Sequence, residues 1–532
     1  MTAAAEAASQ AELSGLPSCT LSASQLGDLE LLLSGAFVPL TGFMTSADAA
    51  SVSAAWQLAD GTSFPIPVTL DVAADDVPDD ADRVLLADPE GTPIAVLTVT
   101  ERSALGNGSA EIYGDAELIR LAGPVTASRP PEHGPFRRLM LSPAEVRAQL
   151  SDGPVLAFAT RAPLGNRQIG QLRHLAGQLR AQLLVLPLVG GGHAEVVGTP
   201  QALIRAALAA MPSLPAGSLI VPVPLAPRPK NGAPAQAHEF AAREVGARAR
   251  VAAAYGATHL MVDGPKLGAA GLPAAAEASA LISMVPAGDW AYDPRAEVWR
   301  PHALIEAGTE QEDLSPDQLG DLLDSGSDIP AWVTPPAVAR ELRRVRRQRS
   351  ERGLVLFLTG LSGSGKSTIA RDLADVLTER SDRQVSLLDG DLVRQLLSAG
   401  LTFSRSDRDL NIARIGFVAA EIARHGGIAI CAPIAPFAAA RGKVRRMVSE
   451  VGDFFLIHVA TPVEVCEARD RKGLYAKARA GLIDQFTGVS DPYEEPADAE
   501  LVIDTSAVSR PEAVHAVLRM LTSGGWLADE RR

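Results

Sequence analysis

The chain has 532 residues, of which 47% are hydrophobic and 21% are charged, as in ordinary globular proteins. At about 150 residues per domain, this length predicts three or four domains with enough chain to bury proper cores. A net charge of -14 argues against a general nucleic-acid-binding protein, which needs a broad basic surface. Segment 389–446 nevertheless has nine Lys or Arg against five Asp or Glu. This local excess of 9 - 5 = 4 positive charges favours a small anion in a cleft.

The three cysteines, Cys19, Cys431 and Cys466, are far apart and odd in number. They therefore indicate neither a disulfide framework nor a zinc cluster, and we expect them to be buried as small apolar side chains. The Ala-rich N-terminus has no cationic segment followed by an apolar core, and no apolar run reaches the roughly 20 residues of a membrane span. We expect a soluble cytoplasmic protein.

The chain divides into three blocks and a linker. Residues 1–145 contain short β-like runs, such as Phe64–Val72 and Thr92–Val99, and predict a small β-rich domain. In residues 146–335, Ala-rich helical patterns alternate with apolar strands, which predicts a parallel α/β nucleotide-binding domain; the strands are Val155–Phe158, Leu183–Leu188, Leu219–Val223 and His259–Val262. Residues 336–352 include seven arginines and predict an exposed helix and linker. Residues 353–532 form the last predicted domain.

A phosphate-binding loop opens this last domain. The buried-strand pattern Leu354–Leu358 leads directly into Gly360–Ser367, which fits G-x-x-x-x-G-K-[ST] and precedes an amphipathic helix. In that context, successive backbone N–H groups cradle phosphate oxygens at a helix N-terminus. We expect the nucleotide site to consist of Gly360, Ser362, Gly363, Ser364, Gly365, Lys366, Ser367 and Thr368. Lys366 would meet the β and γ phosphates, Ser367 would ligate Mg²⁺, and Thr368 would support the start of the helix.

Two carboxylates leave the next strand. The apolar run Val385–Leu388 ends in Asp389-Gly390-Asp391, and the carboxyl ends of strands are where open α/β sheets bind ligands. One carboxylate can hold Mg²⁺ or its water. The other can accept a proton from an incoming hydroxyl group. Read alone, the same tripeptide is also typical of a polar turn.

Cationic side chains follow at regular intervals. Arg408, Asn411 and Arg414 are spaced to share one helical face, and Arg394 precedes them. Planar guanidinium groups suit phosphate or sulfate oxygens, so this pattern indicates a second anion site. A surface helix with salt bridges would give the same spacing.

The last block resembles adenylylsulfate kinase from end to end. The stretches that carry the resemblance are Gly360–Thr368, Leu388–Arg394, Phe403, Asp407–Arg408, Asn411–Gly416, Ile434 with Pro436, Lys472–Tyr475, Lys477–Gly481, Phe486–Gly488 and Asp491–Glu494. The resemblance implies a P-loop kinase domain with a parallel sheet, which uses ATP and Mg²⁺ to phosphorylate the 3′-hydroxyl group of adenylylsulfate. The product would be 3′-phosphoadenylylsulfate.

The resemblance also implies roles for individual residues. Asp391 would be the general base, with Lys366 and Asp389 as the other catalytic residues, and Ser367 and Asp389 would hold the metal. Phe486 would stack on the adenine of adenylylsulfate, and residues 469–479 would form a lid. The remaining residues of the acceptor site would be Arg394, Phe403, Arg408, Asn411, Ile434, Ala435 and Lys472. The family has Ser at position 435 and Pro at position 471, where this chain has Ala435 and Arg471. Direct transfer from ATP needs no hydroxyl group at position 435, so we expect activity to survive.

The first two blocks resemble ATP sulfurylase, through Asp28–Met44, Leu58–Val72, Phe158–Arg161, Tyr255–His259 and Ala307–Thr309. This implies a PUA-like domain followed by a sulfurylase-like α/β domain. However, the family motif Q-T-R-N-P-x-H-x-x-H is replaced by residues 159–168, which lack both histidines, and G-R-D-H-A-G is replaced by residues 263–268. Loss of even one such charge-stabilising donor costs roughly 3 kcal/mol. We therefore expect a silent sulfurylase module, in which Thr160 and Arg161 are a structural remnant or a weak anion site.

Three functional hypotheses remain open. The first is an adenylylsulfate kinase fused to a silent sulfurylase module that acts as scaffold or regulator. The second is a bifunctional enzyme that also makes adenylylsulfate from ATP and sulfate. The third is a nucleotide-sensing module without turnover, against which Lys366, Ser367, Asp389 and Asp391 weigh. By resemblance we also expect a homo-oligomer, a dimer or a hexamer, with small-molecule substrates and with neither nucleic acid nor membrane as a partner.

Overall fold

The structure is a computed structural model that describes residues 15–105, 117–129, 135–191, 199–228, 237–263, 281–402, 404–470, 473–483 and 486–528. It divides into two compact units, which are taken separately here. Residues 1–320 and 328–346 form the first unit, and residues 321–327 and 347–532 form the second. No helix within the described ranges is both long and apolar enough to cross a membrane.

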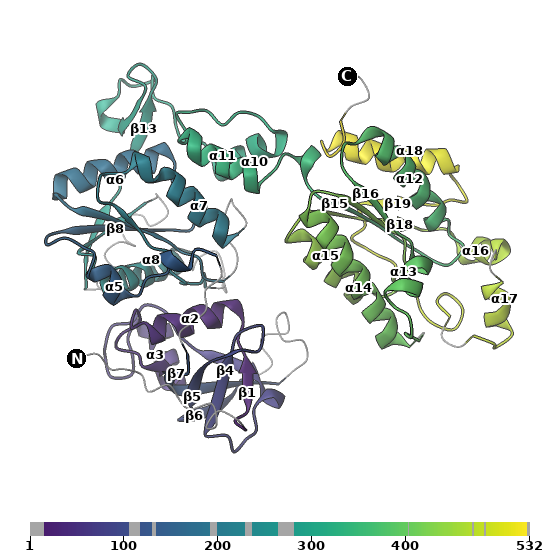
Figure 1. Cartoon of the computed structure of the whole chain (residues 1–532), viewed down its shortest axis with the longest axis horizontal. Helices are drawn as coiled ribbons and strands as arrows, with labels where there is room; N and C mark the ends of the chain where they lie inside the picture. The colour runs from purple at the N-terminus through teal and green to yellow at the C-terminus, as the bar shows by residue number, and fades with distance from the viewer. Residues whose placement is uncertain are drawn as a thin grey trace. The chain divides into compact units, whose positions relative to one another are not determined.

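A mostly antiparallel sheet begins the first unit (Figure 1). Its path runs β1-β4-β5-β7-β2, and β3 and β6 also pair with the long strand β7. The strands are β1 (Ser18–Thr20), β2 (Gly42–Phe43), β3 (Leu70–Ala73), β4 (Arg83–Ala87), β5 (Pro93–Thr98), β6 (Glu101–Leu105) and β7 (Leu118–Ala127), and the helices are α2 (Ala23–Leu33) and α3 (Ser46–Ala55). The β-rich first block predicted from the sequence is confirmed.

The second part of this unit is a parallel α/β layer. Its sheet has the order β10-β9-β8-β11-β12, and all of its ladders are parallel. The strands are β8 (Val155–Thr160), β9 (Gln182–Pro187), β10 (Leu219–Ile220), β11 (His259–Val262) and β12 (Ser283–Pro286), and the helices are α5 (Pro143–Arg147), α6 (Asn166–Leu179), α7 (Pro200–Ala210) and α8 (Ala237–Ala254). Each of the four apolar runs predicted as strands overlaps one of these strands, which confirms the parallel α/β prediction.

These two parts of the first unit share one hydrophobic core. Leu29 and Phe64 from the first part belong to the same buried cluster as Leu184 and Val251 from the second. Helix α8 adds polar ties: Arg250 donates to the carbonyl oxygens of Val38 and Ser63, and its guanidinium lies 4.5 Å from the Phe64 ring centroid. Continuous burial of apolar surface therefore holds both parts as one body.

The arginine-rich segment is divided between the units. Helix α11 (Pro336–Val345) buries Val338 and Leu342 and packs against α7, so it belongs to the first unit. A hairpin of β13 (Trp290–Asp293) and β14 (Val298–Pro301), followed by α10 (Pro316–Ser325), precedes it. From Arg347 onward the chain belongs to the second unit. There, buried Asp324 accepts hydrogen bonds from Arg349 and Arg352.

The second unit is built on a five-stranded parallel sheet with the order β16-β17-β15-β18-β19. Its strands are β15 (Leu354–Thr359), β16 (Val385–Leu388), β17 (Ile428–Cys431), β18 (Asp453–Val459) and β19 (Leu501–Ile503). Its helices are α12 (Lys366–Arg380), α13 (Gly390–Leu396), α14 (Arg405–Arg424), α15 (Ala438–Ser449), α16 (Val463–Arg469), α17 (Leu474–Arg479) and α18 (Arg510–Ser523). The central strand β15 leads directly into the glycine-rich segment.

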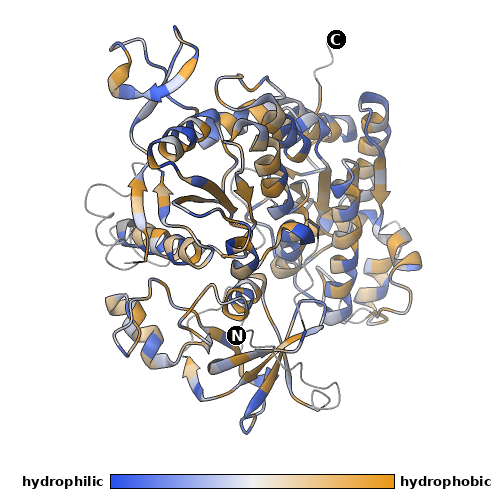
Figure 2. Ribbon diagram, turned by 60° about the vertical axis from the view of Figure 1, so that its left-hand side comes forward, coloured by the Kyte–Doolittle hydropathy of each residue, from blue (hydrophilic) through white to orange (hydrophobic). Residues whose placement is uncertain are grey.

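Helices cover both faces of this sheet (Figure 1). Successive side chains of a strand point to opposite faces. Leu354, Leu356 and Leu358 therefore pack with α12 and α18, while Val355 and Phe357 pack with α14 and α15. Both faces are apolar, and the central strands appear as hydrophobic in Figure 2. This double burial explains the continuous apolar strands in the sequence. All three cysteines are buried and unpaired, as predicted.

One titratable group in the first unit gives a pH-dependent prediction. Burial raises the pKa of the Glu30 carboxyl group on α2 from 4.5 to about 7. The unfolded chain ionises this group at lower pH, so the stability of the fold falls as pH rises from about 4.5 to about 7. Glu30→Gln should therefore raise the Tm of this unit at pH 8, by roughly 2–4 °C for each kcal/mol relieved, and change it little at pH 4.5.

Differential scanning calorimetry at the two pH values measures this effect. Glu90→Gln is the matched control, because Glu90 lies exposed in a turn. An equal change in Tm at both pH values would contradict the assignment to Glu30 ionisation.

Candidate functional site

The phosphate loop lies between β15 and α12, as the sequence predicts. Gly360, Gly363 and Gly365 have φ values of 144°, 79° and 103°, a region that favours glycine. A Cβ atom on Gly360 would lie 2.4 Å from the carbonyl oxygen of Val459, and one on Gly363 would lie 2.9 Å from that of Cys466. Backbone conformation and close packing therefore both require glycine at these two positions.

Lys366 begins helix α12 and is largely buried, with 6% of its surface exposed. Its Nζ donates to the carbonyl oxygen of Leu361 at 2.7 Å and lies 3.4 Å from Ser364 Oγ. The ammonium group is thus folded across the loop itself. Ser367 and Thr368 follow in the first turn of the helix, where backbone N–H groups and the helix dipole favour an anion.

The carbonyl oxygens of the loop are held from outside. Tyr475 Oη donates to the Ser362 carbonyl at 2.9 Å. The hydroxyl groups of Thr461 and Thr505 donate to the Ser364 carbonyl at 3.0 and 2.9 Å. In a trans peptide, the C=O and the following N–H point in opposite directions. Bonds on the outer side therefore direct the N–H groups of Gly363 and Gly365 toward the interior of the loop.

Asp389, one of the two predicted carboxylates, lies at the same edge of the sheet as this loop. Asp389 follows β16 directly and lies 3.9 Å from the guanidinium of Arg371 on α12. Because β16, β17 and β15 are adjacent parallel strands, Asp389 and the phosphate loop share the carboxyl edge of the sheet. Asp391 and Arg394 are on α13, and their side chains lie outside the described part of the structure. The predicted residues Phe403 and Lys472 lie outside the described residues altogether.

Helix α14 carries the predicted anion-binding face. Arg408 and Asn411 are buried on it, with 9% and 8% of their surfaces exposed. Arg408 lies 2.6 Å from the Asp491 carboxylate and 3.1 Å from Thr487 Oγ1. Asn411 Oδ1 is buried and has no hydrogen-bond partner among the described residues. A buried amide oxygen is costly to leave unpaired, which fits a ligand that completes its hydrogen bonding. Arg414 instead donates to the Leu397 carbonyl.

The other predicted acceptor residues lie on loops. Ala435 follows β17, is buried, and has a left-handed φ of 45° that is unusual for a residue with a Cβ. The carbonyl of the preceding Ile434 accepts a 2.6 Å hydrogen bond from Thr359, the residue before the phosphate loop. Phe486 is half-buried, and its ring meets that of Tyr475 edge to face at 5.0 Å. The structure thus joins Ile434 to the donor loop directly and Phe486 to it through Tyr475.

Sequence reasoning assigned no role to Arg441. This residue is buried on α15, and its guanidinium donates to the carbonyl oxygens of Ala435 and Glu494, both at 2.8 Å. It therefore ties the strained Ala435 loop to the segment that includes Asp491. Roles for Thr461 and Thr505 were also missed. Thr461 lies two positions after the end of β18 and Thr505 two positions after the end of β19, a signal that could have been read from the sequence.

In the sulfurylase-like part, Thr160, Arg161 and Gln168 form hydrogen bonds with other groups of the protein. The buried guanidinium of Arg161 donates to the Leu225 carbonyl and lies 3.7 Å from Glu244. Thr160 Oγ1 bonds to the backbone of Ala162 in both directions, at 2.9 and 3.0 Å. Gln168, at the position of the second family histidine, donates to Asp263 at 3.2 Å. Residues 264–268 of the second motif lie outside the described residues.

Arg167 pairs with two acidic side chains of this region. It makes two hydrogen bonds to Asp263, of 2.8 and 3.0 Å, and one of 3.0 Å to Asp313. Burial opposes its charge, yet the pKa of Arg167 is raised because both carboxylates bind the guanidinium. Among the described residues, one cation and two anions meet here, which disfavours an incoming phosphate or sulfate at Arg167.

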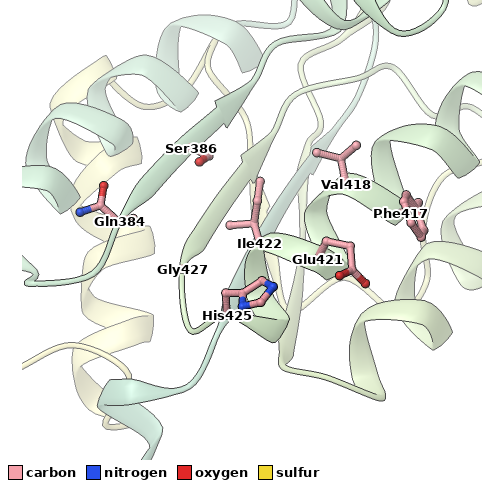
Figure 3. Close-up of a pocket in the computed structure, with 8 residues that line it drawn as sticks. All are labelled: Gln384, Ser386, Phe417, Val418, Glu421, Ile422, His425 and Gly427. Atoms are coloured by element: carbon pink, nitrogen blue, oxygen red, sulfur yellow. The ribbon is translucent and has the colours of Figure 1, made fainter.

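Figure 3 shows a groove of about 440 Å³ elsewhere in the second unit. Gln384 and Gly427 come just before β16 and β17, so the groove lies at the amino ends of these strands. The phosphate loop follows the carboxyl end of β15 and is therefore at the opposite edge of the sheet. The groove is lined by Gln384, Ser386, Phe417, Val418, Glu421, Ile422, His425 and Gly427.

The edge of the sheet at the carboxyl ends of the strands fits a nucleoside triphosphate with Mg²⁺. Glycine-only backbone positions and a buried lysine suit the phosphates, while Ser367 and Asp389 offer one hydroxyl and one carboxylate oxygen. Within the described ranges, no group of three or more His, Cys, Asp or Glu is placed to hold a metal ion. Such a cluster is unnecessary for Mg²⁺, which takes few protein ligands when substrate phosphates supply the others.

Sequence comparisons agree with this division of the chain. Family profiles match in chain order: a PUA-like domain over residues 1–109, ATP-sulfurylase over residues 137–345 and adenylylsulphate kinase over residues 352–504. A sulfate adenylyltransferase of Phaeosphaeria nodorum is 38% identical over 564 residues, covering 97% of this chain and 95% of the relative. A sulfate adenylyltransferase of Mycosarcoma maydis is 37% identical, covering 96% and 94%.

A solved structure has the same architecture. The hexameric APS kinase from Thiobacillus denitrificans superposes with a TM-score of 0.76 at 34% identity, over 97% of this chain and 95% of its own. The matches confirm the predicted PUA-like, sulfurylase and P-loop kinase parts. The chain therefore belongs to the family of fused sulfate-activation proteins in which PUA-like and ATP-sulfurylase domains precede an adenylylsulphate kinase domain.

Proposed function

We propose that this protein transfers the γ-phosphoryl group of Mg·ATP to the 3′-hydroxyl group of adenylylsulfate. The observation that carries the proposal is one sheet edge bearing both a phosphate loop and a buried anion-binding face. Lys366 and the loop amides serve the donor, while Arg408 and Asn411 serve an anionic acceptor. The unpaired Asn411 Oδ1 supports a ligand at that place.

In the proposed reaction, protein groups position the substrates and stabilise charge. Loop amides and Lys366 hold the β and γ phosphates of ATP. Ser367 and Asp389 would hold Mg²⁺, which when bound would supply charge neutralisation at the phosphates. Asp391 accepts the proton of the 3′-hydroxyl group. The oxygen of that hydroxyl group forms a bond to the γ phosphorus, and the bond between the γ phosphorus and ADP breaks. Phe486 stacks on the adenine of adenylylsulfate, and the remaining acceptor contacts come from Arg394, Phe403, Arg408, Asn411, Ile434, Ala435 and Lys472.

We further propose that the sulfurylase-like part does not catalyse adenylylsulfate formation. The family histidines are replaced by Gly165 and Gln168, and the remaining cations are engaged internally, Arg161 by Leu225 and Glu244 and Arg167 by Asp263 and Asp313. Charge that develops on an α-phosphate would meet no prearranged donor at these positions. This part then serves as scaffold or regulator of the kinase.

The alternative is a bifunctional enzyme that also forms adenylylsulfate from ATP and sulfate. The relatives from Phaeosphaeria nodorum and Mycosarcoma maydis support it, since both are named sulfate adenylyltransferase and match nearly end to end. The pairing of Arg167 with Asp263 and Asp313 favours the proposal of a sulfurylase-like part without activity. A direct assay separates the two.

We also propose that the chain assembles as a homo-oligomer, and as a hexamer in particular. A hexameric relative that matches 97% of this chain supports this state. Size-exclusion chromatography with light scattering should give about six times the chain mass of 55.6 kDa. A monomer at micromolar concentration would contradict the proposal.

Kinase turnover should depend on Lys366 and Asp391. Lys366→Ala removes the cation at the β and γ phosphates, and Asp391→Asn removes the proton acceptor, so each should lower kcat by about 100-fold or more. Formation of 3′-phosphoadenylylsulfate from adenylylsulfate and Mg·ATP measures this. Lys443→Ala is the matched control, because Lys443 is exposed on α15. A fully active Lys366→Ala variant, or a wild type without product, would refute the kinase.

Sulfate should not stimulate pyrophosphate release from ATP. The assay uses wild-type protein, whose kinase consumes any adenylylsulfate formed and so prevents product inhibition. Arg161→Ala provides a second readout: it should leave the background rate unchanged if the module is silent, and lower a real sulfurylase rate. Sulfate-dependent pyrophosphate release that falls in Arg161→Ala would establish the bifunctional alternative.

A further inference from the structure

Tyr475 contacts both halves of the proposed kinase site. It lies on the short helix α17 and is among the largest fully buried side chains of the described residues, with 1% of its surface exposed. Its hydroxyl group donates to the Ser362 carbonyl in the phosphate loop at 2.9 Å. Its ring meets Phe486 with centroids 5.0 Å apart and planes at 77°. One rigid side chain with two rotatable bonds thus spans the donor loop and the acceptor aromatic residue.

The start of α17 fixes the position of this side chain. The Asp470 carboxylate accepts hydrogen bonds from the backbone N–H groups of Tyr475 and Ala476, at 3.1 and 3.0 Å. These backbone bonds lower the pKa of Asp470, so the carboxylate stays ionised and the tie persists at neutral pH. Tyr475 is therefore held by its backbone, its hydroxyl group and its ring.

The hydroxyl contact bears on the donor. By holding the Ser362 carbonyl from outside, Tyr475 turns the N–H of Gly363, which belongs to the same peptide group, toward the phosphate side. Without this bond, a carbonyl that packs under a buried side chain loses its partner, at a cost of about 1–3 kcal/mol to the loop conformation. A loop with an unfixed peptide binds phosphate less well because ordering must then occur on binding.

The ring contact bears on the acceptor. Edge-to-face contact with Tyr475 restricts the rotation of the half-buried Phe486 ring. Other bonds fix only its backbone: the Phe486 N–H donates to Ser490 Oγ at 2.9 Å, and its carbonyl accepts from Asp491 N–H at 3.1 Å. The plane that the Phe486 ring presents to a base therefore depends on where the Tyr475 ring lies.

We propose that Tyr475 is a positioning residue that couples the two substrate sites, so that ATP in the phosphate loop and adenylylsulfate against Phe486 each favour the same placement of its ring. This inference rests on the proposed kinase function. It adds a physical connection between the ATP site and the adenylylsulfate site. Either substrate then stabilises the ring position that the other substrate requires. Coupling of this kind is reciprocal and typically amounts to about 5-fold to 150-fold in affinity.

Tyr475→Phe tests the proposal, since it deletes the bond to Ser362 and keeps the ring. The KM for Mg·ATP should rise about 5-fold to 10-fold, and the KM for adenylylsulfate at saturating Mg·ATP should rise as well, because the loss of coupling is reciprocal. Calorimetric titration gives the coupling directly, as the Kd for adenylylsulfate with and without a non-hydrolysable ATP analogue. The wild type should show tighter binding with the analogue, and Tyr475→Phe should bring the ratio toward 1.

Two further variants separate positioning from general damage. Phe486→Leu should raise the KM for adenylylsulfate and, in combination with Tyr475→Phe, should give coupling that is no weaker than in Tyr475→Phe alone. Tyr292→Phe, in the sulfurylase-like part, is the matched control and should change neither KM. Thermal melts establish that each variant is folded.

An unchanged ratio of the two Kd values for adenylylsulfate in Tyr475→Phe would overturn the inference, whether or not the KM values rise. Failure of the proposed kinase function has a different signature, because the wild type itself would then form no 3′-phosphoadenylylsulfate. Active wild type with an indifferent Tyr475→Phe would leave the kinase standing and remove the coupling role.

Discussion

Backbone amides can bind phosphate only if their carbonyl partners are held away from it, and the second unit is organised around this constraint. Strand β15, at the centre of a fully parallel sheet, delivers the chain to the loop. Left-handed glycines provide the turn, and hydroxyl groups from the ends of neighbouring segments hold the carbonyls of Ser362 and Ser364 on the outer side. The carboxylates and cations of the acceptor side then need only reach the same edge of the sheet. Specific chemistry is therefore added to a backbone arrangement that packing and hydrogen bonding have already fixed.

In the first unit too, apolar strands set the framework on which polar residues are arranged. Its parallel order β10-β9-β8-β11-β12 and continuous core depend on apolar strands, which the sequence retains. Polar residues at the sulfurylase position satisfy one another through Arg167, Asp263 and Asp313. Internal pairing of this kind removes the cost of unsatisfied buried groups when no ligand is present. Such pairing satisfies the polar groups of this part of the fold from within the chain.

The phosphate loop and the strands were predictable because their signals are local in the sequence. Apolar runs of four to six residues mark strands buried on both faces, and Gly360–Ser367 specifies its own backbone conformation. Resemblance brought Arg408, Asn411 and Phe486 to one site, but it did not indicate what holds them. Arg441 and Tyr475 act through contacts with residues distant in sequence, such as Ala435 and Ser362. Contacts of this kind depend on how helices pack on the sheet, and no local pattern encodes them. The resemblance also did not indicate that Thr487 and Asp491 pair with Arg408.

Residues 321–327 precede the kinase fold in the chain but belong to the same compact unit as that fold. Asp324 precedes the kinase fold in the chain, yet it is buried in the second unit and pairs with Arg349 and Arg352, while Arg349 also lies over the Trp526 ring. A gene fragment that starts at Gly353 would encode every proposed catalytic residue. It would omit Asp324, Arg349 and Arg352. The Trp526 ring would then lose the guanidinium of Arg349, and Asp453 would lose that of Arg352, while Arg383 would stay bonded to the Trp526 carbonyl. A kinase fragment that keeps residues 321–352 should therefore be more stable than one that starts at Gly353.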